Sequence, residues 1–295
     1  MKVLIIPDVH ARRFWKYACN EHIDKVDHIV FLGDYFDPYY MEYDPYRDTI
    51  INGKHVLGDN IIADDNMLTN FMEIIKLKEA NPDKVHLLLG NHDMHYISRK
   101  FYNYCGGTRW NYKYHTAIEA LFADDIDKFQ YAYSLDCNEY TLLCTHGGIN
   151  LGWYNLYGGG IEHHKQDIFT KDTKPNEIAD IINNLKEDDP KFSCLCDIAW
   201  VRGGNDKYGG PFWCNATELF DGKEYEYKTW APFGDKLFQI TGHTQLKEDP
   251  IVLNNSICCD VRRAFIFDTD SKKLFELDGT ECLTLNELKK NSKKY

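Results

Sequence analysis

The chain has 295 residues, of which 46 are Asp or Glu and 34 are Lys or Arg, and its formal net charge at pH 7 is -12. This negative surplus argues against a surface built to neutralise phosphate backbones, so nucleic acid is not an expected partner. The length is sufficient for a large core. We expect a single domain over residues 1–295, with insertions at 38–66 and 147–236.

The first apolar run, residues 3–6, is too short for a secretory signal or a membrane span, so we expect a cytoplasmic protein without a membrane partner. The ten cysteines occur singly or as Cys194-x-Cys196 and Cys258-Cys259. This spacing is not typical of a disulfide framework or a zinc knuckle, and it predicts buried, reduced thiols.

Five apolar runs, each typical of a buried strand, end in residues that can bind metal ions. In chain order they are VLIIPDVH with Asp8 and His10, HIVFLGDYFD with Asp34 and Asp37, HLLLGNHD with Asn91, His92 and Asp93, LLCTHGG with His146, and LFQITGHT with His243. Helical patterns at 12–20 and 67–80 separate the early runs. The alternation predicts a largely parallel sheet that gathers these polar residues at the carboxyl ends of its strands.

The segments 38–66 and 147–236 interrupt this alternation, and we expect both to lie over the strand ends. After His243 the sequence predicts a strand at ICCDV and a hairpin that turns at 270–273. A final helix is expected to begin with a capping box formed by Thr284 and Glu287. The last third of the chain should therefore be more antiparallel than the first.

Any one of these polar residues could be an ordinary helix cap or a structural histidine. Their joint occurrence at five strand ends is different, because several carboxylates and imidazoles in one crevice are unfavourable unless cations offset the charge. Mixed Asp, His and Asn ligands suit Mn, Fe or Zn better than Ca or Mg. The pattern therefore indicates a transition-metal site.

The ordered segments DVH, GDYFD, GNHD, THGG and GHT resemble the signature of the calcineurin-like metallophosphoesterases, and the resemblance runs from residue 8 to residue 244. It implies an α/β fold, an α/β/β/α sandwich of two mixed β-sheets flanked by helices. It also implies two divalent or transition metal ions. By ligand type we expect Mn or Fe, with Zn as an alternative. In that arrangement Asp8 and His10 hold one ion, Asn91, His146 and His243 hold the other, and Asp34 bridges both.

Two segments, THGGIN and CDIAWVRGG, resemble the phosphoprotein-phosphatase branch of the family, which includes bacterial and phage protein phosphatases and diadenosine tetraphosphatases. The resemblance implies attack by a metal-bridging hydroxide on a phosphomonoester, in a phosphoprotein or a small molecule, or on a nucleotide polyphosphate. His92 would protonate the leaving group and Asp37 would orient His92. A phosphorylated substrate is the expected partner, and the oligomeric state stays open.

The sequence departs from that branch at Pro38, where the branch has an arginine that holds the substrate phosphate. Proline cannot donate a hydrogen bond. Arg202 is the best remaining candidate, because a guanidinium can bind two phosphate oxygens, although it could instead pack on Trp200. The weaker candidates, which we expect to face solvent, are Arg12, Arg13, Arg99 and Arg109.

Two other functions remain open at this stage. A phosphodiesterase or nuclease on the same fold is disfavoured by the acidic charge and by Gln245, which stands where those branches have a second histidine. A non-catalytic, metal-binding scaffold is disfavoured by the intact ligand positions. The Tyr-rich segment 37–46 could stack an aromatic leaving group, or it could be a packed loop.

Overall fold

The computed structural model describes residues 1–38, 50–51, 54–55, 67–98, 111–159, 167–220, 231–253, 255–284 and 287. Its first sheet has six strands in the order β13-β12-β1-β2-β5-β6. Strands β1, β2, β5 and β6 are parallel, and β12 and β13 join the edge in antiparallel pairing. Their bounds are Lys2–Ile6 (β1), His28–Phe31 (β2), Val85–Leu88 (β5), Phe129–Gln130 (β6), Phe265–Asp268 (β12) and Lys273–Glu276 (β13).

The second sheet has five strands in the order β10-β11-β9-β8-β7. Strands β8, β9 and β11 are parallel, whereas β7 and β10 are antiparallel to their neighbours. The bounds are Ala132–Cys137 (β7), Tyr140–Thr145 (β8), Leu237–Thr241 (β9), Ile251–Val252 (β10) and Ser256–Cys258 (β11). Within the insertion 38–66, Ile50–Ile51 (β3) and Lys54–His55 (β4) form a separate two-stranded ribbon.

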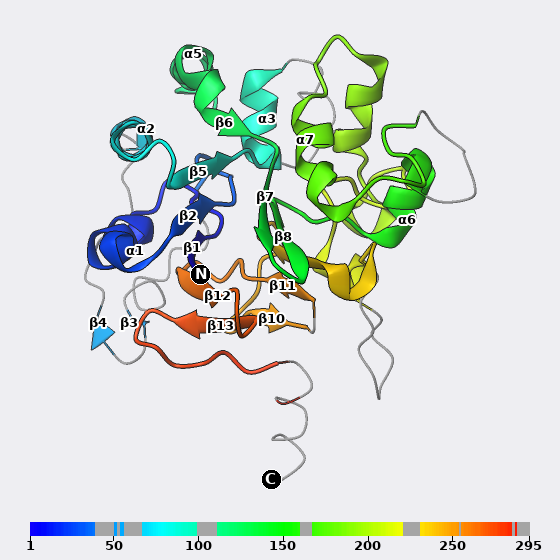
Figure 1. Cartoon of the computed structure of the whole chain (residues 1–295). Coiled ribbons are helices and arrows are strands. Elements are labelled where there is room, and N and C mark those ends of the chain that lie inside the picture. Colours follow the sequence, from blue (N-terminus) through cyan, green and yellow to red (C-terminus); the bar gives the residue numbers. More distant parts are fainter. Residues whose placement is uncertain are drawn as a thin grey trace.

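Helices cover the outer faces of the two sheets. In Figure 1, α1 and α2 lie on one side of the strands, and α6 and α7 lie on the other. The helices are α1 (Phe14–His22), α2 (Met67–Ala80), α3 (Asn91–Ile97), α5 (His115–Asp125), α6 (Leu151–Tyr154) and α7 (Ile178–Asn183). The π-helical turn η5 (Asn155–Gly159) and the 3-10 turns η1 (Ile23–Lys25), η4 (Ile126–Lys128), η6 (Pro175–Glu177), η7 (Pro190–Cys196), η8 (Trp200–Arg202), η9 (Ala216–Glu218) and η10 (Gly234–Lys236) complete the helical elements.

The two-residue period of the strands divides the core into two parts. On β1, Val3 and Ile5 belong to a cluster shared with Leu142 and Ile240 of the second sheet, so this cluster lies between the sheets. Leu4 and Ile6 belong to the larger cluster that includes residues of the covering helices. Strands that are buried on both faces read as continuous apolar runs, which explains the sequence pattern.

The α/β/β/α sandwich implied by the family resemblance is confirmed. The expectation of one largely parallel sheet is wrong, because β8 and β9, which precede His146 and His243, belong to the second sheet. Periodicity identifies a strand but not its neighbour, and these pairings join residues distant in the chain. In each sheet the strands that lead to predicted site residues are nevertheless parallel.

Most of the local predictions are confirmed. The helix expected at 67–80 is α2, and the hairpin that turns at 270–273 joins β12 to β13 with Asp268 opposite Lys273. The helix expected at 12–20 begins only at Phe14, because His10 and Ala11 have positive φ angles of 42° and 60°. The nine cysteines of the described residues are unpaired thiols, and eight of them are buried.

The predicted capping box near the end of the chain is also present. The Glu287 carboxylate accepts hydrogen bonds from the backbone and side chain of Thr284, whose Oγ1 accepts a bond from the Glu287 backbone. The helix expected beyond it lies outside the described residues.

The loops after β2 and β5 are tied together by the buried carboxylate of Asp93. Its Oδ2 accepts hydrogen bonds from the backbone N–H groups of Asp34 at 2.7 Å and Gly90 at 2.8 Å, and its Oδ1 accepts one from Tyr35 at 2.9 Å. The bond to Gly90 is the cap that the sequence predicts for the following helix. The other two bonds reach the neighbouring strand, so one side chain fixes both loops.

We predict that Asp93→Asn lowers the free energy of unfolding by about 3 kcal/mol. One carboxamide oxygen cannot serve three N–H donors, and the new NH₂ group would face one of them in a buried position. Chemical denaturation followed by circular dichroism measures the change. Asp124→Asn, on the exposed face of α5, is the control and should leave stability within about 0.5 kcal/mol. Equal stability of the two variants would contradict this role of Asp93.

Candidate metal centre

The predicted site residues lie in turns with an unusual backbone. His10, Asp34, Asp37 and His243 have φ angles of 42°, 54°, 60° and 62°, in the left-handed region that few non-glycine residues adopt. Such strain is typical of functional sites, where the surrounding structure holds the backbone in place. Each of these turns bends sharply after its strand and brings a polar side chain to the sheet edge.

Glycines permit these turns to approach one another. Gly33 has a φ of 102°, and a Cβ there would meet the backbone of Gly90 on the adjacent loop. A Cβ on Gly90 would in turn meet the Asp34 carboxylate, and one on Gly242 would meet the Asp8 carboxylate. The glycine that precedes Asp34, Asn91 and His243 in the sequence therefore makes room for a neighbouring loop or side chain.

One group of donor atoms surrounds the Asn91 side chain. Its Oδ1 lies 2.9 Å from His146 Nε2 and 2.9 Å from His243 Nδ1. The Nδ1 of His146 donates to the Leu32 carbonyl at 2.7 Å, so in the neutral imidazole the Nε2 lone pair faces Asn91. These are the three residues that the resemblance assigns to one ion, and they come from α3 and from the ends of β8 and β9.

A second group surrounds Asp34. Its Oδ2 lies 3.6 Å from His10 Nε2 and 3.4 Å from His146 Nε2. The Nδ1 of His10 donates to the Phe36 carbonyl at 2.8 Å, which leaves Nε2 directed at the site. Asp8 lies beside this group, and both of its carboxylate oxygens accept the backbone N–H of His243, at 2.9 and 3.1 Å.

Among the described residues, two sets of three side chains bring their ligand atoms within 4.8 Å of one another. One set is His10, Asp34 and His92, and the other is Asp8, Asp34 and His146. Asp34 is the member common to both sets. The structure therefore brings all six predicted ligands together, and the shared carboxylate is the one expected to bridge two ions.

The electrostatics of the site favour positively charged occupants. Burial and the nearby Asp34 charge raise the pKa of Asp8 to about 6, although His146 acts against this rise. Burial lowers the pKa of His146, but Asp34 and Asp8 outweigh that effect and raise it to about 10. Burial would raise the pKa of Asp34, yet His146 and His92 hold it well below its usual value. A proton is thus attracted to the place where metal ligands converge.

The donor set fits the two metal ions typical of the family. Donors that share an ion at about 2.0 to 2.2 Å lie roughly 3.0 to 3.6 Å apart, and the separations at Asn91 and Asp34 range from 2.9 to 3.6 Å. The mixture of imidazole, carboxylate and amide ligands suits transition metals.

A buried hydrogen-bonded network lies beside the metal ligands. His92 Nδ1 donates to Asp37 Oδ2 at 3.0 Å, and Tyr96 Oη donates to Asp37 Oδ1 at 2.5 Å. His95 Nε2 lies 3.1 Å from the same Oδ2. Burial would raise the pKa of Asp37, but the bonds from His92 and His95 outweigh burial and lower it. The predicted pair of His92 and Asp37 is therefore formed, within a larger network.

The sequence did not identify His95 and Tyr96 as parts of this network. His95, which follows none of the apolar runs directly, is buried at 3% exposure. The signal was the spacing: His95 and Tyr96 follow His92 by three and four residues, which places them on the same face of α3.

Arg202 lies on η8 and contacts the turn that carries His243. Its Nη2 donates to Thr244 Oγ1 at 2.9 Å and to the His243 carbonyl at 3.4 Å. The Trp200 side chain is 66% exposed and donates its Nε1 to the Asn205 carbonyl. The guanidinium thus reaches the metal ligands, and burial, Arg202 and His146 together hold the pKa of His243 well below its usual value.

One of the weaker arginine candidates differs from expectation. Arg12 is buried at 6% exposure and does not face solvent. Arg13 is half-buried, with its Nε atom covered. Arg12 partly offsets buried Asp260, whose pKa is raised well above its usual value by burial and by Asp8. Arg99, Arg109 and residues 39–46 of the Tyr-rich segment lie outside the described residues.

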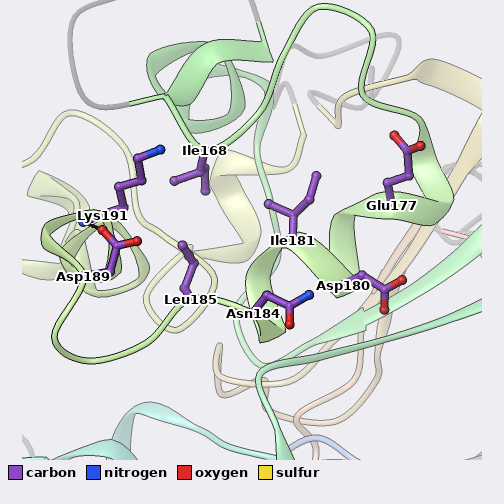
Figure 2. Close-up of a pocket in the computed structure, with 8 residues that line it drawn as sticks. All are labelled: Ile168, Glu177, Asp180, Ile181, Asn184, Leu185, Asp189 and Lys191. Carbon is purple, nitrogen blue, oxygen red and sulfur yellow. Dashed lines mark hydrogen bonds between the residues drawn. The ribbon is translucent and has the colours of Figure 1, made fainter.

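A separate shallow depression of about 490 Å³ lies along α7 and the turn that follows it (Figure 2). Figure 2 shows Glu177 and Asp180 at one end and Asp189 at the other, around Ile181 and Leu185. Its lining residues include none of the predicted ligands.

No helix of the described residues is long and apolar enough to cross a membrane.

Comparisons with known proteins identify the family of this chain. A search of curated proteins finds no match. One similar solved structure is a protein serine/threonine phosphatase from Saccharomyces cerevisiae with similarity to human phosphatase PP5. Its sequence identity is 13%, its TM-score is 0.42, and the match covers 88% of this chain and 66% of that chain. A second structure is 13% identical, with a TM-score of 0.32 over 92% of this chain and 96% of that chain. The model of the calcineurin-like phosphoesterases matches residues 1–247, so the chain belongs to this family.

Proposed function

We propose that the protein is a dinuclear metal-dependent phosphatase that hydrolyses a phosphomonoester or a nucleotide polyphosphate. The observation that carries this proposal is the shared position of Asp34, whose carboxylate belongs to both groups of converging ligand atoms. In the proposed site Asp8 and His10 hold one ion, Asn91, His146 and His243 hold the other, and Asp34 contacts both. By ligand type we favour Mn or Fe, with Zn as an alternative.

Bound ions would make a nucleophilic water available near neutral pH and offset the charge of the phosphate oxygens. The chain's own residues supply the other functions. Backbone hydrogen bonds and the glycine contacts described above hold the turns that carry Asp8, His10, Asn91, His146 and His243. The ligands are therefore preorganised. Water attacks phosphorus, the bond from phosphorus to the leaving oxygen breaks, and that oxygen requires a proton.

His92 is the proposed donor of this proton. Its Nδ1 is committed to Asp37, so its Nε2 is the nitrogen that can serve a leaving group. Because Asp37 is buried and its pKa is lowered, it remains ionised and can stabilise the imidazolium form of His92. The bond also fixes the orientation of the ring.

Arg202 is the proposed phosphate clamp. Its Nη2 is held by Thr244, whereas its buried Nε has no hydrogen-bond partner among the described residues. A buried donor of this kind is unfavourable until an acceptor arrives. A phosphate oxygen would supply that acceptor, and this supports Arg202 as the replacement for the arginine that the phosphoprotein-phosphatase branch has at position 38.

The proposed function predicts a preference for monoesters. We expect the metal-loaded protein to hydrolyse p-nitrophenyl phosphate at least tenfold faster than bis(p-nitrophenyl) phosphate, and to lose both activities in chelator. Asp34→Asn should also lose activity and metal, whereas Gln245→Ala, at an exposed position, should retain both. Faster hydrolysis of the diester would instead favour the phosphodiesterase alternative. Metal binding without turnover of either ester would favour the scaffold.

For the proton donor, His92→Asn should lower kcat by about 10²- to 10⁴-fold on an alkyl phosphate, the usual effect of removing a positioned general acid. The loss should be much smaller on an aryl phosphate, because a good leaving group requires little protonation. Metal content, measured by mass spectrometry, should stay unchanged. Loss of an ion from this variant would show that His92 is a ligand, in agreement with its closeness to His10 and Asp34.

For the clamp, Arg202→Ala should reduce kcat/KM by an amount equivalent to about 2 to 4 kcal/mol, as expected for a charge-assisted contact in a partly buried site. Arg202→Lys should recover only part of this loss, because an ammonium group lacks the planar fork. Trp200→Ala is the control and should leave kcat/KM nearly unchanged. If both alanine variants lower only the melting temperature, Arg202 has a packing role.

A further inference from the structure

A second convergence of ligand atoms lies away from the predicted catalytic residues. His28 begins β2 and His86 is the second residue of β5, so both lie near the amino-terminal ends of strands whose carboxyl ends lead to Asp34 and Asn91. Alternation along the strands places His28 with Val30 and His86 with Leu88, both of which pack between the sheets. Tyr133 of β7 meets the two histidines from the second sheet.

His28 Nδ1 has two polar neighbours in this cluster, but it can form a well-directed hydrogen bond with only one of them. His28 Nδ1 lies 3.3 Å from His86 Nε2 and 3.1 Å from Tyr133 Oη. An imidazole nitrogen carries either one lone pair or one hydrogen, so it can make only one well-directed hydrogen bond. The His86 ring also stacks on the Tyr133 ring with centroids 3.7 Å apart, which holds both rings in place.

The separation of the two imidazole nitrogens, 3.3 Å, matches an edge of a coordination polyhedron. Two imidazole nitrogens bound to Zn²⁺ at about 2.0 to 2.1 Å with tetrahedral angles lie roughly 3.3 Å apart. The same convergence of nitrogen and oxygen donors occurs around Asn91 in the catalytic site.

The two imidazoles are in the neutral form that binds metal. Burial lowers the pKa of His28, and burial, His28 and Lys78 together lower that of His86 to about 3, so both imidazoles are neutral at pH 7. Burial raises the pKa of the Tyr133 phenol, so this group is neutral as well, and an ion would have to displace its proton. The other charged groups that act on the pair are Asp27 and Lys84, which have opposite signs. All three side chains of the cluster remain partly exposed, so an ion can reach them.

We propose that His28 Nδ1, His86 Nε2 and Tyr133 Oη form a separate transition-metal site that binds Zn²⁺, with water in the fourth position. An ion there joins β2 and β5 of the first sheet to β7 of the second. Its function is structural, because it clamps the two sheets at a distance along the strands from the phosphatase ligands.

The test is a count of bound zinc. The full-length protein is saturated with Zn²⁺, freed of unbound metal by gel filtration and measured by mass spectrometry. We expect three ions per chain in the wild-type protein and two in His28→Gln and in His86→Gln. Tyr133→Phe, which keeps the stacked ring, should weaken binding of the third ion at least tenfold. His115→Gln, on α5, is the control and should keep three.

Two further readouts separate this site from the catalytic one. His86→Gln should retain phosphatase activity, and it should lose the additional rise in melting temperature that Zn²⁺ produces in the wild-type protein. A wild-type count of two ions or fewer would overturn the proposal, whether or not the variants fold. Equal counts in the wild-type protein and in folded His86→Gln would also overturn it, and the cluster would then be a hydrogen-bonded pair only.

Discussion

The candidate centre depends on the contacts of one carboxylate, that of Asp34. Its Oδ1 accepts the backbone N–H of His92 at 2.8 Å, and its Oδ2 faces His10 and His146. Its own backbone N–H is held by Asp93. Asp34 therefore connects loops that follow β1, β2, β5 and β8, and these strands belong to both sheets. The packing of the two sheets determines whether the ligands meet, so the inter-sheet core supports function as well as stability.

Several features that usually destabilise a protein are concentrated at this edge. Left-handed backbone at non-glycine residues costs on the order of 1 kcal/mol or more at each position, and the carboxylates of Asp8, Asp34 and Asp260 are buried close together. The apolar runs that precede these turns form two extensive cores, which offset the cost. Cations bound in the proposed site would offset the remaining negative charge, which would link metal binding to folding stability.

Sequence analysis predicted which side chains converge because each follows its own strand, and a strand with its turn is a local pattern. It could not assign His146 and His243 to the second sheet, since that depends on pairings between distant segments. It also missed Asp260 and the burial of Arg12, because their partners come from opposite ends of the chain. The place of His95 in the network could have been predicted, because its spacing from His92 puts both residues on one face of a helix that begins after Gly90. The single-domain organisation and the residue roles stay predictions.

Under the proposed function, Pro38 implies that phosphate is held from a different side than in the phosphoprotein-phosphatase branch that the sequence resembles. In the proposed site the clamp comes from η8 and contacts the turn after β9, whereas the proton donor comes from the first turn of α3. Arg202 contacts the His243 carbonyl, and His92 shares a group of converging ligand atoms with His10 and Asp34. In the proposed site, a phosphate beside these ligands would lie between the clamp and the proton donor.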